Sequence, residues 1–463
     1  MQTMSLQRLA STVNGSLMGE NVHFNAISTD TRSIKEGDLF VALQGKNFDA
    51  NDFVDQADEK GAVAALVSAD IAVDMPYVKV GDTLSALAAL AKQQRELVGI
   101  PVVGITGSNG KTSVKEMLAS ILRQSNMVLA TEGNSNNQIG VPLTLLKLTL
   151  EHDIAVVEMG ASKRGDIAEL CDIAQPTVVI LNNVGAAHLE GFGDLQSVAN
   201  TKGEIVSGLS KQGTAVLNRD EPWFNQWCEK LAGRKLVSFG ASAKADVWAD
   251  LDKANMAVVN GQFVTRFTLR YQENRLDIKL NMLGQHNVLN ALAAASAAIS
   301  LDISFDDIRD GLSKLPSVEG RMQPLVGVAG NMIINDCYNA NPKSFEAAMS
   351  CLENIEQPVW VVLGDFAELG ADCGKIHQQL GKSIVDSCVQ RFYAVGENMK
   401  FAVNEFNKLS APTHRQAIHF LNKEELSDNL LRELDAKVVV LIKASRSQGL
   451  ESVVEKITVR SDG

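Results

Sequence analysis

A glycine-rich segment has the residue types of a phosphate-binding loop. Gly104, Gly107 and Gly110 recur at every third position and are followed directly by Lys111 and Thr112. Glycines let the backbone turn so that successive N–H groups face phosphate oxygens, and a following helix adds the positive end of its dipole. In this interpretation Lys111 reaches the β- and γ-phosphates, and the Thr112 hydroxyl ligates Mg²⁺. The pattern predicts nucleoside triphosphate binding, and does not by itself separate ATPase, GTPase, kinase and ligase.

Three side chains further along the chain could complete such a site. Glu158 closes an apolar run at 154–158, and His188 follows another at 177–182. Carboxyl ends of neighbouring parallel strands meet at one edge of a sheet, so both side chains are expected beside the loop, where Glu158 would be a magnesium ligand. Lys202 lies in a helical stretch, and a surface lysine is the simpler interpretation of that residue alone.

The elements around the loop predict a parallel sheet. An apolar run at 101–106 precedes the loop and a helical pattern at 111–123 follows it, which is the context that phosphate loops require. Short apolar runs then alternate with helical stretches, including one at 197–209, which predicts helices on both faces of the sheet. Two alternating runs, 263–270 and 276–280, predict an antiparallel hairpin appended to it.

Similar alternation marks two further regions. The first ~80 residues mix short β-like runs with helical patches, and a second α/β pattern begins after a turn near 315–320. The sequence thus predicts an α/β protein of three domains: a central P-loop parallel sheet with appended antiparallel strands, preceded by an N-terminal domain and followed by a C-terminal Rossmann-like domain. The expected boundaries are 1–82, 83–314 and 315–463.

Composition excludes several classes of protein. The chain has 463 residues, 21% charged and 45% hydrophobic, with a net charge of −12. An acidic balance argues against a nucleic-acid or anionic-membrane binder, although local groups can still bind a small anion. No apolar run approaches the ~18 residues of a membrane span, and the six cysteines form no C-x-x-C pair. We therefore expect a reduced, cytoplasmic protein without a disulfide framework or zinc site.

Taken together, these motifs resemble the muramyl (Mur) ligases, the ATP-dependent amide ligases of peptidoglycan precursor synthesis. The resemblance covers essentially the whole chain; the matching parts are 107–112, Glu158, His188, 202–204, 286–290, 320–321 and 336–342. Four segments are similar to the member that adds the terminal dipeptide: 28–32, 133–142, 338–342 and 363–370. A D-N-P-R segment, typical of the diaminopimelate-adding relative, is absent from the sequence.

The resemblance implies roles for individual residues. It implies ATP and two magnesium ions, the metal ligands being Thr112, Glu158, His188 and Lys202, a lysine that is carbamylated in several relatives. Lys111, Glu158, His188 and Lys202 would be catalytic. ATP would be bound by Gly107, Ser108, Asn109, Gly110, Lys111, Thr112, Ser113, Asn287, Asn290, Arg321 and Asp336. The substrates would be bound by Ser28, Asp30, Arg32, Asn134, Asn136, Tyr338 and Asn339. Residues 443–446 match a Lys-Gly-Ser-Arg segment of relatives, except for Ala444.

The implied reaction has two small-molecule substrates besides ATP. Nothing in the sequence demands an oligomer, so we expect a monomer. The carboxylate of UDP-N-acetylmuramoyl-tripeptide would attack the γ-phosphate, and the amine of D-alanyl-D-alanine would attack the resulting acyl phosphate. Three alternatives stay open. They are another ligase of the same fold (one that adds a single amino acid, or a folylpolyglutamate synthase), a kinase, and a non-catalytic ATP-binding regulatory module.

Overall fold

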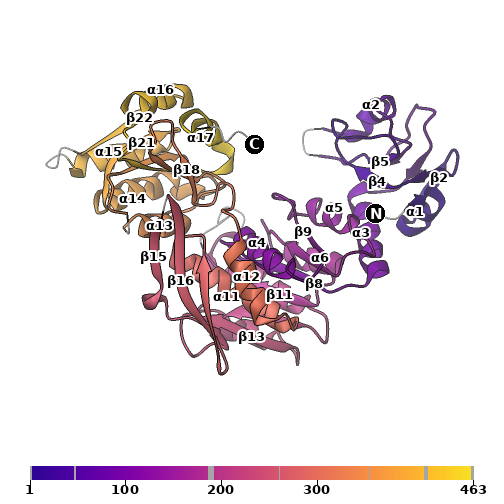
Figure 1. Cartoon of the computed structure of the whole chain (residues 1–463). Coiled ribbons are helices and arrows are strands. Elements are labelled where there is room, and N and C mark those ends of the chain that lie inside the picture. The colour runs from indigo at the N-terminus through magenta and orange to yellow at the C-terminus, as the bar shows by residue number, and fades with distance from the viewer. Residues whose placement is uncertain are drawn as a thin grey trace.

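The chain is built around three separate β-sheets, each associated with its own helices. The computed structural model describes residues 3–45, 48–185, 192–259, 261–353, 355–410 and 415–459. In Figure 1 the indigo N-terminal part and the orange-to-yellow C-terminal part lie on opposite sides, above the magenta and salmon central part. Within these ranges the three sheets have five, ten and six strands in chain order, and a further two-stranded sheet accompanies the first. The α/β fold class predicted from the sequence is confirmed.

The N-terminal sheet is mostly parallel. Its order is β2-β7-β6-β5-β4, and only β2 runs antiparallel to its neighbour. Helix α1 packs against α3, the helix that leads into the central part. The elements are β1 (Met4–Ser5), α1 (Leu6–Val13), β2 (Ser16–Met18), β3 (His23–Phe24), β4 (Ala26–Ser28), β5 (Asp38–Val41), η1 (Ala50–Phe53), α2 (Val54–Glu59), β6 (Ala64–Val67) and β7 (Tyr77–Lys79).

The central sheet joins parallel strands to an antiparallel edge, as predicted. The strands from β9 through β8 to β14 run parallel, and β15, β16 and β17 pair antiparallel. The elements are α3 (Thr83–Val98), β8 (Val102–Thr106), α4 (Lys111–Leu122), β9 (Val128–Ala130), α5 (Gly140–Leu146), β10 (Ile154–Glu158), α6 (Asp166–Ala174), β11 (Val178–Leu181), α8 (Leu195–Lys202), α9 (Glu204–Ser207), β12 (Thr214–Asn218), α10 (Phe224–Glu229), β13 (Lys235–Gly240), β14 (Val247–Trp248), η2 (Leu251–Lys253), β15 (Asn255–Val259), β16 (Gln262–Tyr271), β17 (Asn274–Leu280), α11 (Gln285–Ser300) and α12 (Phe305–Lys314).

Helices cover both faces of the central sheet because its inner strands are apolar on both sides. Alternate residues of β8 enter different cores: Val102 packs in the core formed with α3, α5 and α6, and Val103 in the core formed with α4, α11 and α12. Strand β8 lies between β10 and β11. The carboxyl ends of these three strands therefore converge where the phosphate loop begins.

The C-terminal sheet resembles a doubly wound fold, with helices on both faces. Its order is β18-β19-β23-β20-β21-β22, and only β18 is antiparallel. The elements are β18 (Gln323–Val326), β19 (Met332–Asp336), α13 (Pro342–Leu352), β20 (Val359–Gly364), η3 (Gly370–Asp372), α14 (Cys373–Val385), β21 (Val389–Val395), α15 (Met399–Ser410), β22 (Gln416–Phe420), α16 (Lys423–Glu433), β23 (Val439–Lys443), η5 (Arg446–Gln448) and α17 (Glu451–Ile457).

One predicted helix is interrupted. The stretch expected to be one helix over 197–209 forms α8 and α9, which are separated at Gly203. A Cβ at Gly203 would lie 2.9 Å from Cδ1 of Trp227, so the indole ring packs against the backbone there. Within the described ranges, no helix combines the length and apolar character needed to cross a membrane.

Candidate active site

The phosphate loop connects β8 to α4 and ends at Gly110, which cannot be replaced without steric conflict. Gly110 has a φ of 77°, and a Cβ there would lie 2.5 Å from Oδ1 of Asn290 and 2.7 Å from Nδ2 of Asn182. Gly110 is the N-cap residue of α4, and no side chain caps that helix end. The first N–H groups of α4 and its positive dipole end are therefore available to an anion.

Two asparagines after β11 hold the loop in shape. The backbone N–H of Ser108 donates to the Asn183 carbonyl (3.0 Å), and that of Asn109 donates to Asn183 Oδ1 (2.9 Å). Asn182 Nδ2 donates to the Asn109 carbonyl (3.0 Å) and to Asn290 Oδ1 (2.8 Å). Neither asparagine was among the residues predicted for the site, although their position directly after the strand next to β8 is a signal for it.

A chain of buried amides links the loop to α11. Asn290 Nδ2 donates to Asn287 Oδ1 (3.1 Å), and both side chains are almost fully buried. Buried amides need such partners because an unpaired polar group away from water is costly. The predicted nucleotide residues Asn287 and Asn290 therefore lie behind the loop and support it, in addition to lining the adjoining pocket.

Thr112 and Glu158 form an oxygen-rich corner at the start of α4. Thr112 Oγ1 donates to Glu158 Oε2 (3.0 Å), and Asn136 Nδ2 donates to Glu158 Oε1 (2.8 Å). Arg321, from the C-terminal part, donates from Nη2 to Thr112 Oγ1 (3.2 Å). The chain section that the structure describes holds no group of three or more His, Cys, Asp or Glu side chains arranged to bind a metal ion. Mg²⁺ suits this corner, because it typically takes one or two protein carboxylates and completes its shell with phosphates and water.

Two lysines face the same space, Lys202 buried and Lys111 half-buried. Lys111 Nζ donates to the Gly107 carbonyl (2.9 Å), and burial lowers the pKa of its ammonium, an effect that Glu158 opposes and Arg321 reinforces. Lys202 is 2% exposed, and its pKa lies well below the ordinary lysine value because of burial and the nearby Lys111 charge. Within the described part of the chain, the Lys202 amine has no hydrogen-bond or ion-pair partner. It lines a cavity instead.

That cavity has the properties of a phosphate site. Its volume is about 280 Å³, and polar groups dominate its lining. The basic side chains of its lining are Lys111, Lys202 and Arg321, and the acidic ones are Glu158 and Asp166. The remaining predicted residues that line it are Ser108, Asn109, Gly110, Asn134, Asn136, Tyr338 and Asn339. The uncapped end of α4 and the cations of Lys111 and Arg321 fit a polyphosphate, with the Thr112–Glu158 corner at its edge.

The C-terminal part touches the loop directly. Asn341 Nδ2 donates to Asn109 Oδ1 (2.7 Å), and Lys343 Nζ donates to the Val184 carbonyl (3.1 Å). Tyr338 Oη donates to Asn134 Oδ1 (3.2 Å), while the Arg321 guanidinium lies 4.0 Å from the centre of the Tyr338 ring. Asn341 also caps α13 in a capping box with Ser344. The start of this helix is thereby fixed against the phosphate loop.

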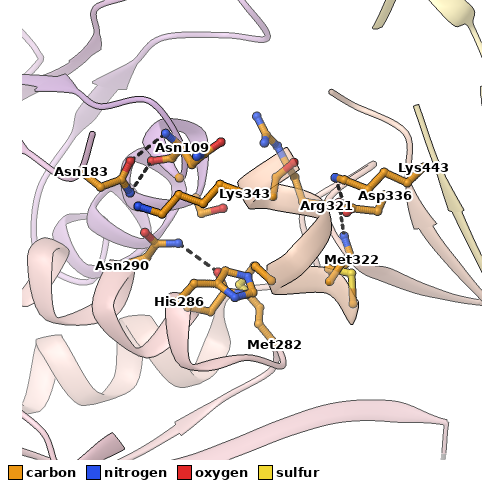
Figure 2. A pocket seen from close by; sticks show the side chains of 16 residues that line it. Asn109, Asn183, Met282, His286, Asn290, Arg321, Met322, Asp336, Lys343 and Lys443 are labelled. Atoms are coloured by element: carbon orange, nitrogen blue, oxygen red, sulfur yellow. Dashed lines mark hydrogen bonds and ion pairs between the residues drawn. The ribbon is translucent and has the colours of Figure 1, made fainter. Parts of the chain in front are cut away.

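A second, smaller pocket adjoins the loop between the central and C-terminal parts (Figure 2). Its volume is about 140 Å³. Its walls combine Met282 and Met322 with the polar side chains of Ser113, Asn287 and Asn290. Figure 2 shows Lys343 reaching across it towards Asn109 and Asn183. Apolar walls with a few polar groups suit a planar ring system.

Buried charges close the far side of this pocket. Lys443 Nζ and Asp336 Oδ2 form an ion pair (2.6 Å), and Asp336 Oδ1 accepts from the Met322 N–H (3.1 Å). Burial lowers the pKa of His286 to about 4, so its imidazole is neutral at physiological pH. The predicted residue Asp336 is therefore already paired, and it orients the strand that carries the pocket wall.

The three predicted N-terminal residues form a cluster of their own after β4. The Ser28 hydroxyl donates to the Asp30 carbonyl (2.9 Å), and Arg32 Nη2 forms an ion pair with Asp30 Oδ2 (2.6 Å). The hydrogen bonds from Arg32 hold the pKa of the Asp30 carboxyl at about 2. These residues line neither the phosphate cavity nor the adjoining pocket. His188 lies outside the described residues.

Comparisons with known proteins agree along the whole chain. Family models match at residues 23–124 ("Mur ligase family, catalytic domain"), 105–298 ("Mur ligase middle domain") and 320–446 ("Mur ligase, glutamate ligase domain"). A curated relative, UDP-N-acetylmuramoyl-tripeptide--D-alanyl-D-alanine ligase of Escherichia coli K12, is 40% identical over 99% of both chains. MurF from Acinetobacter baumannii superposes with a TM-score of 0.89 at 31% identity over 98% of each chain. MurF from Thermotoga maritima, solved with ADP, has a TM-score of 0.80 at 29% identity, with 93% of this chain and 96% of that chain covered.

Proposed function

The chain belongs to the Mur ligase family, a family of ATP-dependent amide ligases, and we propose that it joins D-alanyl-D-alanine to UDP-N-acetylmuramoyl-tripeptide. The observation that carries the proposal is the meeting of Lys111, Thr112 and Glu158 at an uncapped helix end, closed over by Arg321. A second support is the full-length similarity to relatives named for this reaction. The products are the pentapeptide precursor, ADP and phosphate.

The first step makes an acyl phosphate. A carboxylate oxygen of the tripeptide forms a bond to the γ-phosphorus while the bond to the β-γ bridging oxygen breaks, and ADP leaves. Phosphoryl transfer depends on positioning and charge neutralisation. Lys111, the N–H groups of α4 and Arg321 supply both, because they surround the cavity in which the phosphates would lie. The dipeptide amine then attacks the acyl carbon, loses a proton and displaces phosphate.

Magnesium belongs to the proposal, with two ions expected. Thr112 and Glu158 would hold the first ion and His188 the second, with carbamylated Lys202 as a further ligand. When bound, the ions neutralise the repulsion between the acceptor carboxylate and the triphosphate. We expect turnover to stop in excess chelator and to return when magnesium is restored. Full activity with chelator present would contradict this part of the proposal.

Carbamylation of Lys202 is part of the same proposal. The lowered pKa of this buried amine favours the neutral form, whose lone pair can attack the carbon of CO₂ and release a proton. The resulting carbamate would be an anionic ligand in place of an ammonium. A nucleotide-bound crystal grown with bicarbonate should show the adduct, and a bare amine there would count against it.

The two remaining substrates are assigned to different regions. Ser28, Asp30 and Arg32 would hold the uridine diphosphate portion of the acceptor, and Asn134 and Asn136 would lie near its pyrophosphate. This division goes with three domains at 1–82, 83–314 and 315–463, the N-terminal one binding the acceptor.

The dipeptide would enter a cavity between the central and C-terminal parts. Its volume is about 290 Å³, and it shares Asn134, Asn339 and Asn341 with the phosphate cavity. Arg446 lines it and can pair with the carboxylate of the dipeptide. Ala444, which stands where relatives have glycine, does not change the wall of this cavity. Its side chain is buried and points towards Gly364, where an added Cβ would lie 2.8 Å from it.

A product assay tests the reaction. The purified protein is given ATP, magnesium and the UDP-linked tripeptide with either D-alanyl-D-alanine or single amino acids, and products are identified by mass. We expect the pentapeptide, with phosphate released in equal amount. Ligation of a single amino acid alone would favour another ligase of this fold, and a stable phosphorylated product would indicate a kinase. ADP formation independent of acceptor and amine would indicate a regulatory module.

Lys111→Ala tests the site itself. Loss of the buried ammonium should lower kcat at least about 10²–10³-fold, the usual cost of removing one group that stabilises transition-state charge. Circular dichroism and thermal unfolding should remain close to wild type, because Lys111 bonds only to the loop carbonyl of Gly107. Ligation at the wild-type rate by the folded variant would refute the site assignment.

We also propose that the protein is cytoplasmic and monomeric. All six cysteines are free thiols, which suits a reducing compartment. Light scattering across a range of protein concentrations would test the monomer, and a mass of twice 49.9 kDa would overturn it.

A further inference from the structure

Lys115 is a buried lysine that lines none of the site's cavities. It lies on α4 one turn after Thr112, and it is 1% exposed. Its Nζ donates to the Thr131 carbonyl (2.6 Å) and forms an ion pair with Glu116 (2.7 Å). Taking an ammonium out of water is expensive unless it is paired and hydrogen-bonded. Lys115 is therefore held in a well-defined position at the cost of burying its ammonium, although it does not line the substrate cavities.

Thr131 connects Lys115 to the backbone of Glu158. It follows β9, is 1% exposed, and its N–H donates to the Val156 carbonyl (3.0 Å). Its hydroxyl Oγ1 accepts a hydrogen bond from the N–H of Glu158 (3.0 Å). Thr131 is thus fixed by Lys115 and Val156 through its own backbone, and it fixes the backbone of Glu158 through its side chain.

The two groups proposed to bind magnesium, the Thr112 hydroxyl and the Glu158 carboxylate, are both positioned by α4. Thr112, on the first turn of α4, bonds directly to the Glu158 carboxylate. Lys115, on the next turn, reaches the Glu158 backbone through Thr131. A shift of α4 would move the hydroxyl and the carboxylate together, so their separation is preserved.

We propose that Lys115 and Thr131 are positioning residues that hold Glu158 in its metal-binding orientation. The inference rests on the proposed function, which assigns Glu158 to magnesium. Groups that orient a metal ligand without touching the metal typically change affinity about 10–100-fold when removed. The effect should therefore fall on the metal and leave the nucleotide contacts intact.

Manganese binding provides a test that needs no turnover. Mn²⁺ replaces Mg²⁺, and its binding to the protein with ADP is measured by the loss of the free-ion electron paramagnetic resonance signal. Thr131→Val removes the hydroxyl at nearly constant volume and should weaken Mn²⁺ binding about 10–100-fold. ADP binding in chelator, measured by calorimetry, should stay within about twofold of wild type because no nucleotide contact is lost. Thr131→Ser, which keeps the hydroxyl, should restore the metal affinity.

Two further variants make the comparison specific. Lys115→Met should weaken Mn²⁺ binding in the same direction, and if it does not fold, the Thr131 pair decides the question. Thr144→Val is the matched control: Thr144 is 4% exposed and bonds through its hydroxyl to the Gly140 carbonyl on α5. It should bind Mn²⁺ like wild type.

The outcomes separate this inference from the proposed function. If Glu158→Gln weakens Mn²⁺ binding but Thr131→Val does not, the positioning role is overturned while the metal assignment stands. If Glu158→Gln binds Mn²⁺ as wild type does, the metal assignment fails and the inference fails with it. Equal losses in Thr131→Val and Thr131→Ser would also overturn it, because the hydroxyl would then have no part in the effect.

Discussion

The N-terminal and C-terminal parts are attached to the central part in different ways. The C-terminal part contacts the phosphate loop with side chains: Arg321 bonds to Thr112, and Asn341 bonds to Asn109. The N-terminal part contacts α3 instead, where Thr83 bonds to the Ala42 carbonyl and Thr12 bonds to Gln93. Changes in the C-terminal part should therefore affect ATP chemistry, and changes in the N-terminal part should affect only its own substrate.

Arg321→Ala should give the largest effect in this comparison. The variant loses the cation over the phosphate cavity, the bond to Thr112 and the stacking on Tyr338. We expect kcat/KM for ATP to fall by about 10²-fold, as for loss of one charge-stabilising group. Arg391→Ala is the control, since Arg391 also stacks on an aromatic ring, that of Trp360, but lies outside the site cavities. Equal effects of the two variants would show that Arg321 has no specific role at the phosphate cavity.

Lys343→Met should give a smaller change of the same kind. Its ammonium bonds to the Val184 carbonyl across the smaller pocket that adjoins the phosphate loop. Its loss should therefore weaken the contact between the C-terminal and central parts without changing the Thr112–Glu158 corner. We expect the KM for ATP to rise about tenfold with little change in kcat, the value of one charge-assisted hydrogen bond. Steady-state kinetics checks this, with the exposed Lys375→Met as control. A fall in kcat with an unchanged KM would contradict it.

Arg32→Ala should change the KM for the UDP-linked acceptor and leave that for ATP untouched. About a tenfold rise is expected from one lost charge-assisted contact. Because the pKa of Asp30 is held at about 2, this carboxyl stays ionised above about pH 4, and the pair is lost only as the pH falls towards 2. The acceptor KM should therefore show no titration of Asp30 near neutral pH. A matching rise in the KM for ATP would contradict the expectation that the N-terminal part affects only the acceptor.

Thr12→Val should have the smallest effect. It removes the hydroxyl that bonds to the Gln93 side chain and to the Arg8 carbonyl of its own helix, so stability should fall by about 1 kcal/mol. Both KM values should stay within about twofold, because neither cavity is involved. Thermal unfolding and kinetics on the same preparation measure this. A large kinetic change would mean that the orientation of the N-terminal part controls the chemistry.

Much of the fold followed from local sequence patterns. The strand expected at 154–158 has those bounds, and the hairpin at 263–280 forms as predicted. Apolar runs between turn residues are strong signals because buried parallel strands need both faces apolar. The phosphate loop was equally visible, since its glycines, its lysine and its flanking elements are contiguous.

The connections between segments were not visible in the sequence. Asn136 bonds to Glu158 and Lys343 reaches Val184, yet neither pair shares a spacing or a motif. Such contacts depend on side-chain directions after the sheets have assembled, which no periodicity encodes. The same holds for Lys115, which is indistinguishable in the sequence from a helix lysine exposed to solvent.

The order of strands in the C-terminal sheet has a consequence for biosynthesis. β23 lies in the interior, between β19 and β20, although it is the last strand of that sheet along the chain. A ribosome must therefore complete residues 439–443 before the sheet can close and before Lys443 can pair with Asp336. The central part, whose strands end at residue 280, can assemble earlier. A nascent chain would thus carry a formed phosphate loop well before it could close over ATP.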